Sequence, residues 1–398
     1  MRALGPGERG TFAWAAALVA VAVALPLLHY RTRDPDSVLY AEMAARMSAQ
    51  PIARWVAPEW PPRWYMQGLY REHPAGIFAP PALLARLGYP PEQAAYAVNA
   101  AYQVLTLVLV QRLAAAVAAP VEARALAWLL QLLPIAFTYR VRANQEQAVV
   151  LFMVAALLGT ELSRARRRWA LLTASGLVGL VLVKGVLGLL GPVVCALWLL
   201  TRRPAAVPLR AGWTSLAGAV AAVTLAVVAY EATYRLAVGE PFLGPYLGRQ
   251  LGLAAVPRSE AVLAQKAHNL VWYLGRVLWF PFPWSLALLA AVLSRSGRTE
   301  ARASGLGFVL ALTGLYVGLF SLSDRRADRY IFPVYYAVGA AGTVAALRAW
   351  PRFRGVAERL DRWRAVGPAA LFLLLFALHV AGGRLLRLPT IKLWPPDS

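Results

Sequence analysis

The sequence contains little charge and almost no cysteine. Only 15% of its 398 residues are charged and 59% are hydrophobic, whereas a soluble domain carries roughly 25% charged residues. The single cysteine, Cys195, lies inside an apolar run and excludes an internal disulfide. A chain so poor in charge, with a mean hydropathy of +0.53, indicates an integral membrane protein.

Long apolar stretches recur along the chain. Phe12–Tyr30 and Ala365–Gly383 contain no charged side chain, and a membrane-spanning helix needs about 20 apolar residues. The runs do not alternate between polar and apolar positions, so helices are predicted rather than barrel strands. We predict an all-α bundle of about eleven spans in one transmembrane domain over residues 1–398. Their approximate extents are 12–30, 93–111, 125–139, 147–163, 169–183, 186–201, 211–236, 276–294, 303–322, 330–347 and 366–383.

The net charge of +22 comes largely from arginines in short loops between these runs. If the spans alternate, the clusters within 164–168, 202–210 and 348–364 share one side of the membrane, which the positive-inside rule makes cytoplasmic. This pattern accounts for the charge, and no nucleic-acid partner is expected. We predict a multi-pass protein of the cell membrane, with the loops 31–92 and 324–329 on the extracytoplasmic side.

The loop 31–92 is long enough to have structure of its own. Asp36–Met47 is predicted as a short helix in the membrane interface because its apolar residues fall on one side. Ile77–Tyr89 is apolar but short, and Pro80-Pro81 interrupts it, which indicates a re-entrant or interfacial helix. No sizeable soluble domain is predicted.

Acidic side chains at the predicted outer face are candidates for catalysis. Asp34 and Asp36 directly follow the first span, where an unpartnered carboxylate is costly. They are candidates for a general base or a pair of metal ligands, and the alternative is that Asp36 caps the helix that follows. Glu146, in the polar segment Arg142–Gln147, supplies another carboxylate on the same side, or simply suits the start of a helix.

Lys184 is unusual because lysine is rare in this chain. The sequence has 41 lysines and arginines but only three lysines, and Lys184 is surrounded by apolar residues. A lone ammonium group at such a position needs a partner or a cavity. An anionic lipid phosphate at the outer interface would be a suitable partner, and the alternative is a lysine that snorkels to the membrane surface.

More basic and aromatic residues lie at the same face. The segment Asp324–Tyr330 contains Arg325, Arg326 and Arg329, and guanidinium groups bind phosphate through a rigid fork of donors. An ordinary surface loop has the same composition. The aromatic residues of Trp55–Tyr70 would form either a sugar-binding platform or an interfacial belt, and His73 is a further polar candidate in that loop.

Six short motifs occur in a fixed order, and each lies on the predicted outer face or starts a span there. They are Asp36 followed by Tyr40-Ala41-Glu42, His73-Pro74 to Gly88, Glu146, Val183-Lys184-Gly185, Pro283-Trp284 and Arg329-Tyr330-Ile331-Phe332-Pro333. In this order the sequence resembles the C-type membrane glycosyltransferases (GT-C), in particular the branch of lipid A aminoarabinose transferase and protein O-mannosyltransferase. The match runs to about residue 345. The sequence departs from the family pattern at Ser37, where an acidic residue is common, at Glu146, where aspartate is frequent, and in a short C-terminal region.

The resemblance implies a function and a site. It implies transfer of a sugar from a polyprenyl-phosphate donor to a hydroxyl of a lipid, glycan or protein, with inversion. Asp36 would be the general base, and Glu146 would assist it or orient the acceptor. Lys184, Arg325, Arg326 and Arg329 would bind the phosphate. The remaining substrate-binding candidates are Asp34, Tyr40, Glu42, His73, Arg142 and Tyr330. No cofactor is implied with certainty, and a divalent metal is left open.

Other classes of function remain open. A transporter or flippase for a lipid-linked substrate would also bury charges, but it predicts inverted repeats and charges near the middle of the membrane. A non-catalytic membrane protein would leave Lys184 and the ordered motifs without a role. An enzyme like the O-antigen ligases or polymerases would share the lipid-linked donor.

Overall fold

The chain is described by a computed structural model. It describes residues 6–28, 34–62, 64, 66–201, 209–255, 262–294, 297, 299, 305–323, 326–363 and 366–385. Within these ranges the regular structure is helical, apart from one isolated bridge between Glu59 and Leu69. The prediction of an all-α chain is therefore confirmed.

The helices follow one another along the chain, and the only helical pieces in the described part of the segment 49–78, between α2 and α3, are short 3-10 turns. The first half contains α1 (Pro6–Leu28), α2 (Pro35–Ser48), α3 (Ala79–Arg86), α4 (Pro91–Val117), α5 (Pro120–Leu129), α6 (Pro134–Thr138), α7 (Glu146–Ser163), α8 (Ala170–Lys184) and α9 (Leu190–Thr201). The second half contains α10 (Leu209–Val238), α11 (Leu243–Ala255), α12 (Val262–Trp279), α13 (Trp284–Leu293), α15 (Leu306–Ser321), α16 (Phe332–Ala349), α17 (Pro351–Asp361) and α18 (Gly367–Leu385). Two 3-10 segments matter for the site: η5 (Gly185–Leu189) and η6 (Asp328–Ile331).

Five helical stretches within the described residues are long and apolar enough to cross a membrane. They are Pro91–Val117, Glu146–Ser163, Arg167–Thr201, Leu209–Val238 and Asp328–Ala349. The bent pair α12–α13 makes a sixth if it is one span, and α1, α15 and α18 contain shorter apolar helices. The chain is thus a multi-pass membrane protein, while the predicted count of about eleven spans is not confirmed.

Proline breaks two of the predicted spans. The span expected at 125–139 is divided into α5, a 3-10 turn and α6, and Pro134 starts the last piece. The span expected at 276–294 was wrong in both start and shape, because α12 begins at Val262 and bends by 98° into α13. Pro281 and Pro283 lie at that bend, where neither has an N–H to continue a helix.

The chain reverses direction immediately after Lys184. Gly185 has a left-handed backbone conformation, with φ at +59°, which glycine adopts without steric cost. Gly188 then lies against the backbone of Leu180, and Gly191 lies against the side chain of Leu177. The stretch Arg167–Thr201 is therefore a helical hairpin, as the turn predicted at Lys184 implies.

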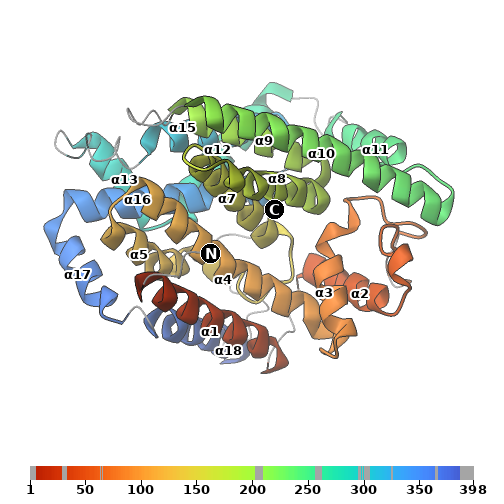
Figure 1. Ribbon diagram of the computed structural model, residues 1–398, viewed down its shortest axis with the longest axis horizontal. Coiled ribbons are helices and arrows are strands. Elements are labelled where there is room, and N and C mark those ends of the chain that lie inside the picture. The colour runs from red at the N-terminus through yellow and green to blue at the C-terminus, as the bar shows by residue number, and fades with distance from the viewer. Residues whose placement is uncertain are drawn as a thin grey trace.

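The candidate polar residues lie at one end of the helices that carry them. Glu146 begins α7, Lys184 ends α8, and Arg329 precedes α16, whereas Arg164, Arg167, Arg168 and Arg348 lie at the opposite ends of the same helices. In Figure 1, α2, α3 and α11 lie at one end of the long axis and α17 lies at the other. This sorting agrees with the arginine pattern of the sequence. The extracytoplasmic location of the polar end stays a prediction.

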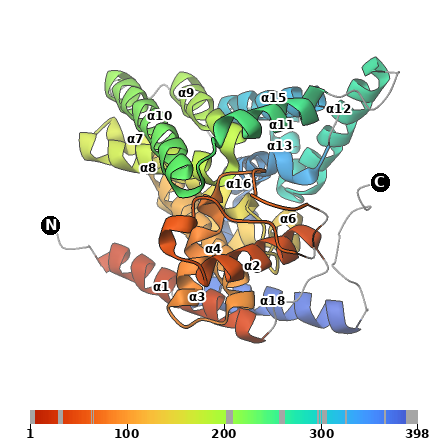
Figure 2. The same ribbon diagram turned by 90° about the vertical axis from the view of Figure 1, so that its right-hand side faces the viewer.

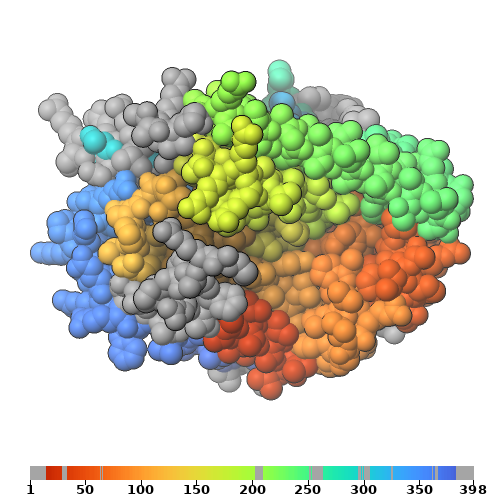
Figure 3. All heavy atoms as spheres, in the orientation of Figure 1, coloured from red at the N-terminus to blue at the C-terminus, as the bar shows by residue number. Residues whose placement is uncertain are grey.

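The segment 34–90 packs as a cap on that end. Its α2 and α3 lie beside the start of α4 (Figure 2), and α3, with 8 residues, is too short to cross a bilayer. The Tyr230 hydroxyl of α10 accepts a hydrogen bond from Ala75 N at 3.0 Å and donates one to Val56 O at 2.8 Å. Arg249 of α11 pairs with Glu72 at 2.7 Å. Figure 3 shows the cap, in orange and red, meeting α10 and α11, in green.

Candidate functional site

Helix α2 presents two aspartates in different ways. Asp34 is the N-cap: its carboxylate accepts a hydrogen bond from Ser37 N at 3.0 Å, and Pro35 occupies the first helical turn. The alternative that Asp36 caps this helix is therefore wrong. Asp36 lies in the first turn with a side chain that is 33% exposed, and it forms an ion pair with Arg329. The N-terminus of α2 favours both negative charges.

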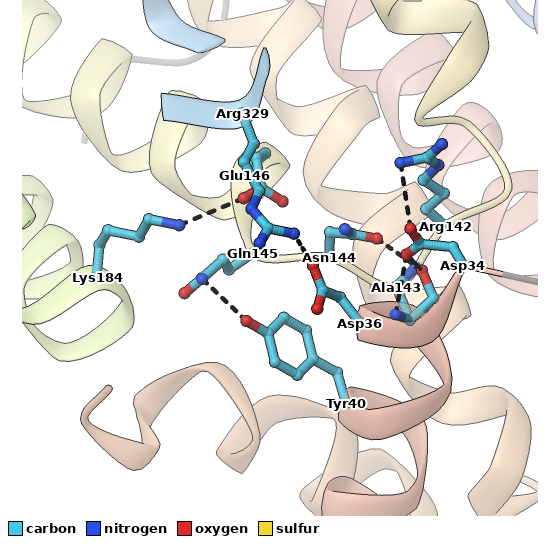
Figure 4. A network of polar contacts seen from close by, with 11 residues as sticks. Asp34, Asp36, Tyr40, Arg142, Ala143, Asn144, Gln145, Glu146, Lys184 and Arg329 are labelled. Carbon is cyan, nitrogen blue, oxygen red and sulfur yellow. Dashed lines mark hydrogen bonds and ion pairs between the residues drawn. The ribbon is translucent and has the colours of Figure 1, made fainter. Parts of the chain in front are cut away.

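Glu146 and Lys184 form a second, buried ion pair. Lys184 Nζ lies 3.3 Å from Glu146 Oε1, and the two side chains are 7% and 2% exposed. Glu146 starts α7 and Lys184 ends α8, so each charge sits at the helix terminus whose dipole favours it. Figure 4 shows Lys184, at the left, and Arg329, from above, both directed toward the segment 144–146. The alternative that Lys184 snorkels to the surface does not describe this buried contact.

Gln145 joins these groups, although sequence reasoning assigned it no role. In the amide orientation that satisfies both of its polar atoms, Oε1 accepts from Lys184 Nζ at 2.8 Å, the Tyr40 hydroxyl at 2.9 Å and His73 Nε2 at 3.1 Å. Burial raises the pKa of Tyr40 well above its usual range, so the hydroxyl keeps its proton and donates. The sequence feature that could have pointed to Gln145 is the polar run 142–147 at the start of an apolar helix.

Ser37 ties α2 to the segment that precedes α7. Its Oγ lies 2.6 Å from Asp34 Oδ2, 2.6 Å from Asn144 Oδ1 and 3.0 Å from Ala143 N. Ser37 is fully buried. Ser37, which stands where the family commonly has an acidic residue, therefore fixes the start of α2 against the segment that precedes α7.

Arg142 supports the same junction from the other side. Its guanidinium lies 3.4 Å from Asp34 Oδ1, with the two side chains 7% and 13% exposed. It also lies 4.6 Å from the centre of the Tyr139 ring. Arg142 and Asp34 thus fix the start of α2 rather than line a cavity.

A cavity lies beside the buried ion pair, and the space between its lining atoms, including the part open to solvent, is about 310 Å³. Its wall combines two cations and one carboxylate with apolar and aromatic side chains, and Tyr330 stacks on Phe320 with ring centres 5.1 Å apart. The lining residues are Glu146, Val149, Lys184, Leu187, Leu190, Tyr316, Phe320, Arg329, Tyr330 and Pro333. We call this the charged cavity.

A larger apolar cavity shares the lining residue Pro333 with the charged cavity, and the space between its lining atoms, including the part open to solvent, is about 780 Å³. It lies among α4, α5, α7, α9, α15 and α16, and its lining includes Met153, Trp198, Leu312 and Ala337. Apart from backbone groups, it offers little but hydrocarbon and aromatic surface. We call this the apolar cavity.

Of the predicted binding residues, Lys184, Arg329 and Tyr330 line the charged cavity. The described candidates that are not among its lining residues are Asp34, Tyr40, Glu42, His73, Arg142 and Arg326. Glu42 accepts a hydrogen bond from Trp64 Nε1 at 3.2 Å within the cap. The Arg326 guanidinium lies 5.6 Å from the centre of the Trp272 ring on α12. Arg325 lies outside the described residues. Within the described part of the chain, no group of three or more His, Cys, Asp or Glu side chains is arranged to hold a metal.

Replacing His73 with glutamine is expected to make the fold less sensitive to mild acid. Burial, and then the positive charges of Lys184 and Arg249, lower the pKa of His73 well below its usual range. The unfolded chain takes up a proton on this residue below about pH 6.5, so the free energy of unfolding falls as the pH drops through that value. We expect His73→Gln to narrow the difference in melting temperature between about pH 7.5 and about pH 5.

A matched control is available on α12. His268 is exposed, so His268→Gln should leave that difference in melting temperature as it is in the unmodified protein. Equal narrowing in the two variants would show that burial of His73 has no special effect.

Comparison with known proteins places the fold. No protein-family model matches the sequence, and no curated protein sequence matches it. Among solved structures, ArnT from Cupriavidus metallidurans in the apo state matches with a TM-score of 0.59 and 21% identity, over 86% of this chain and 61% of that chain. ArnT is a lipid A aminoarabinose transferase of the GT-C type. The chain shares the fold of ArnT.

A second solved structure supports the same assignment. The archaeal oligosaccharyltransferase AglB from Archaeoglobus fulgidus, in complex with an inhibitory peptide and a dolichol-phosphate, matches with a TM-score of 0.52 and 13% identity, over 92% of this chain and 56% of that chain. At these identities the likeness establishes a fold shared with ArnT and AglB, in agreement with the resemblance that the ordered motifs indicated. The chain spans only 61% and 56% of the lengths of these two structures.

Proposed function

We propose that this chain is a membrane glycosyltransferase that moves a sugar from a polyprenyl-phosphate donor to a hydroxyl acceptor at the extracytoplasmic face. One observation carries the proposal: Lys184 and Arg329 line the charged cavity, and that cavity shares the lining residue Pro333 with the apolar cavity. An anionic head group next to an apolar surface matches the chemistry of a lipid phosphate. The GT-C fold, shared with ArnT and AglB, supports the class of reaction.

The two cations would act on the phosphate. In the reaction the bond between the anomeric carbon and the phosphate oxygen breaks, and negative charge grows on the leaving phosphate. Lys184 and Arg329 line the place where that charge would develop. Fixed donors aimed at developing charge commonly supply several kcal/mol of transition-state stabilisation.

Asp36 would take the proton from the acceptor. As the sugar approaches an oxocarbenium-like state, the acceptor oxygen bonds to the anomeric carbon and its proton passes to the carboxylate. Direct attack of this kind inverts the anomeric centre. Glu146 is 1% exposed in the wall of the charged cavity and has one carboxylate oxygen without a hydrogen-bond partner among the described residues. That oxygen would accept a hydrogen bond from a hydroxyl group of the sugar or of the acceptor.

The donor class can be tested by ligand-induced stabilisation. We expect undecaprenyl phosphate to raise the melting temperature of the detergent-solubilised protein, because a ligand that binds only the folded state stabilises it. Undecaprenol, which has the same tail and no phosphate, should give a much smaller shift. Arg329→Ala should remove most of the difference between the two lipids, since it removes one phosphate-binding cation.

Reconstitution in vesicles then distinguishes an enzyme from a carrier. In vesicles, a glycosyltransferase would consume polyprenyl-phosphate sugar and release polyprenyl phosphate in proportion to product. A flippase would move the intact lipid without breaking the sugar–phosphate bond. An equal response to undecaprenol and undecaprenyl phosphate would contradict the proposed donor.

A further inference from the structure

Arg329 belongs to two groups of residues at once. Its guanidinium pairs with Asp36 on α2, and its side chain also lines the charged cavity together with Lys184. Asp36 is not among the residues that line this cavity. Figure 4 shows Arg329 reaching from η6 across the segment 144–146 to Asp36. Arg329 therefore lies between Asp36, the proposed base, and the charged cavity, the proposed phosphate site.

The Arg329–Asp36 pair is more exposed than its neighbours. Its two side chains are 36% and 33% exposed, whereas those of Lys184–Glu146 and Arg142–Asp34 are at most 13% exposed. Ion pairs near solvent contribute little stability and exchange partners readily, while breaking a buried pair leaves an uncompensated charge. Among these three pairs, Arg329–Asp36 is the one that a ligand can displace at low cost.

The contact has a chemical consequence for the base. A carboxylate that is paired with a guanidinium is a weaker base toward a hydroxyl proton than an unpaired one, because the positive charge favours the ionised form. A phosphate in the charged cavity offers the same guanidinium two oxygens in a fork–fork geometry, which is a stronger arrangement than a single contact. The phosphate and Asp36 therefore compete for Arg329.

We propose that the donor phosphate draws Arg329 away from Asp36 and so frees the base for the acceptor. This inference rests on the proposed function, and it adds an order of events to it. Without donor, Arg329 neutralises Asp36 and makes it a weaker base. With donor bound, Arg329 and Lys184 share the phosphate, and Asp36 becomes available. Donor binding thus precedes productive acceptor binding.

The proposed exchange of Arg329 from Asp36 to the donor phosphate makes a specific prediction for Asp36→Asn. Removing the competing carboxylate leaves Arg329 available, so the variant should bind undecaprenyl phosphate about fivefold more tightly than the unmodified protein. The dissociation constant is measured by titrating the detergent-solubilised full chain with undecaprenyl phosphate at fixed salt. An affinity for Asp36→Asn that is unchanged or weaker would overturn the exchange.

Asp34→Asn is the matched control. It removes the same charge two residues away, but the partner of Asp34 is Arg142, which does not line the charged cavity. Its affinity for undecaprenyl phosphate should stay within about twofold of the unmodified protein. Equal tightening in both variants would mean that the effect is one of overall charge, and the exchange would be rejected.

A double-variant cycle gives an independent answer if Asp34→Asn disturbs the helix cap. In an Arg329→Ala background, Asp36→Asn should no longer change the affinity for undecaprenyl phosphate, because the shared cation is gone. A gain that persists without Arg329 would overturn the proposal. If the unmodified protein binds no polyprenyl phosphate at all, the proposed function itself fails. If it binds and the cycle shows no coupling, only the exchange fails.

Discussion

Replacing Lys184 with methionine is expected to destabilise the folded protein by about 3–5 kcal/mol. The substitution leaves Glu146 as an uncompensated carboxylate that is 1% exposed, where the start of α7 lies beside the end of α8. One of its oxygens already has no hydrogen-bond partner among the described residues, so little else is available to absorb the charge. The loss is measured as a lower melting temperature and a lower denaturant midpoint in detergent.

A second substitution separates charge from shape. In Lys184→Met/Glu146→Gln both charges are gone, and a neutral amide replaces the carboxylate with nearly the same volume. We expect this double variant to recover most of the stability, because removing both members of a buried pair costs far less than removing one. If Lys184→Met alone is as stable as the unmodified protein, the buried pair does not carry the energy assigned to it.

Replacing Asp36 with asparagine is expected to lower the rate of sugar transfer by about 10³-fold. Asparagine keeps the size of the side chain but cannot accept the proton of the acceptor hydroxyl. Asp36 is 33% exposed, so the fold should tolerate the change. The rate is measured in single-turnover experiments with saturating polyprenyl-phosphate sugar, which isolate the chemical step from binding.

The pattern of effects is more specific than the loss of activity. Asp36→Asn should bind undecaprenyl phosphate more tightly and yet transfer sugar far more slowly, a combination that misfolding does not produce. Glu59→Gln offers a comparison, because Glu59 is an exposed carboxylate in the same cap. It should leave the rate unchanged. Transfer by Asp36→Asn at a normal rate would remove this residue from the mechanism.

Much of the site was predictable because it sits where helices begin and end. Apolar run length placed the ends of α7 and α8, and those ends carry Glu146 and Lys184. The alternation of the predicted spans then placed Glu146, Lys184 and Arg329 on the same side of the membrane. Helix geometry also separates Asp36 from Glu42: six residues at about 100° each leave them on different faces of α2, whereas Tyr40 shares the face of Asp36. The family motif Tyr-Ala-Glu groups Tyr40 with Glu42 and so does not show that they lie on different faces of the helix.

Other features were not predictable from the sequence. Which cation pairs with which carboxylate depends on tertiary distances, and Arg326 turns to Trp272 on α12 although it adjoins the other arginines in sequence. The bend between α12 and α13 depends on how proline-containing segments are packed, since proline permits a break without fixing its angle. The central place of Gln145 depends on three donors contributed by three distant segments.

The contact between Glu146 and Lys184 also constrains how the chain enters a bilayer during synthesis. α7 and α8 are consecutive and joined by a short connection, so a ribosome supplies both within a few seconds of each other at about 5–20 residues per second. Released singly into lipid, each helix would bring an unmatched charge with it. Released together as a hairpin, they arrive electrically neutral at that end, and this favours insertion of the two helices as one unit before α10 to α18 are translated.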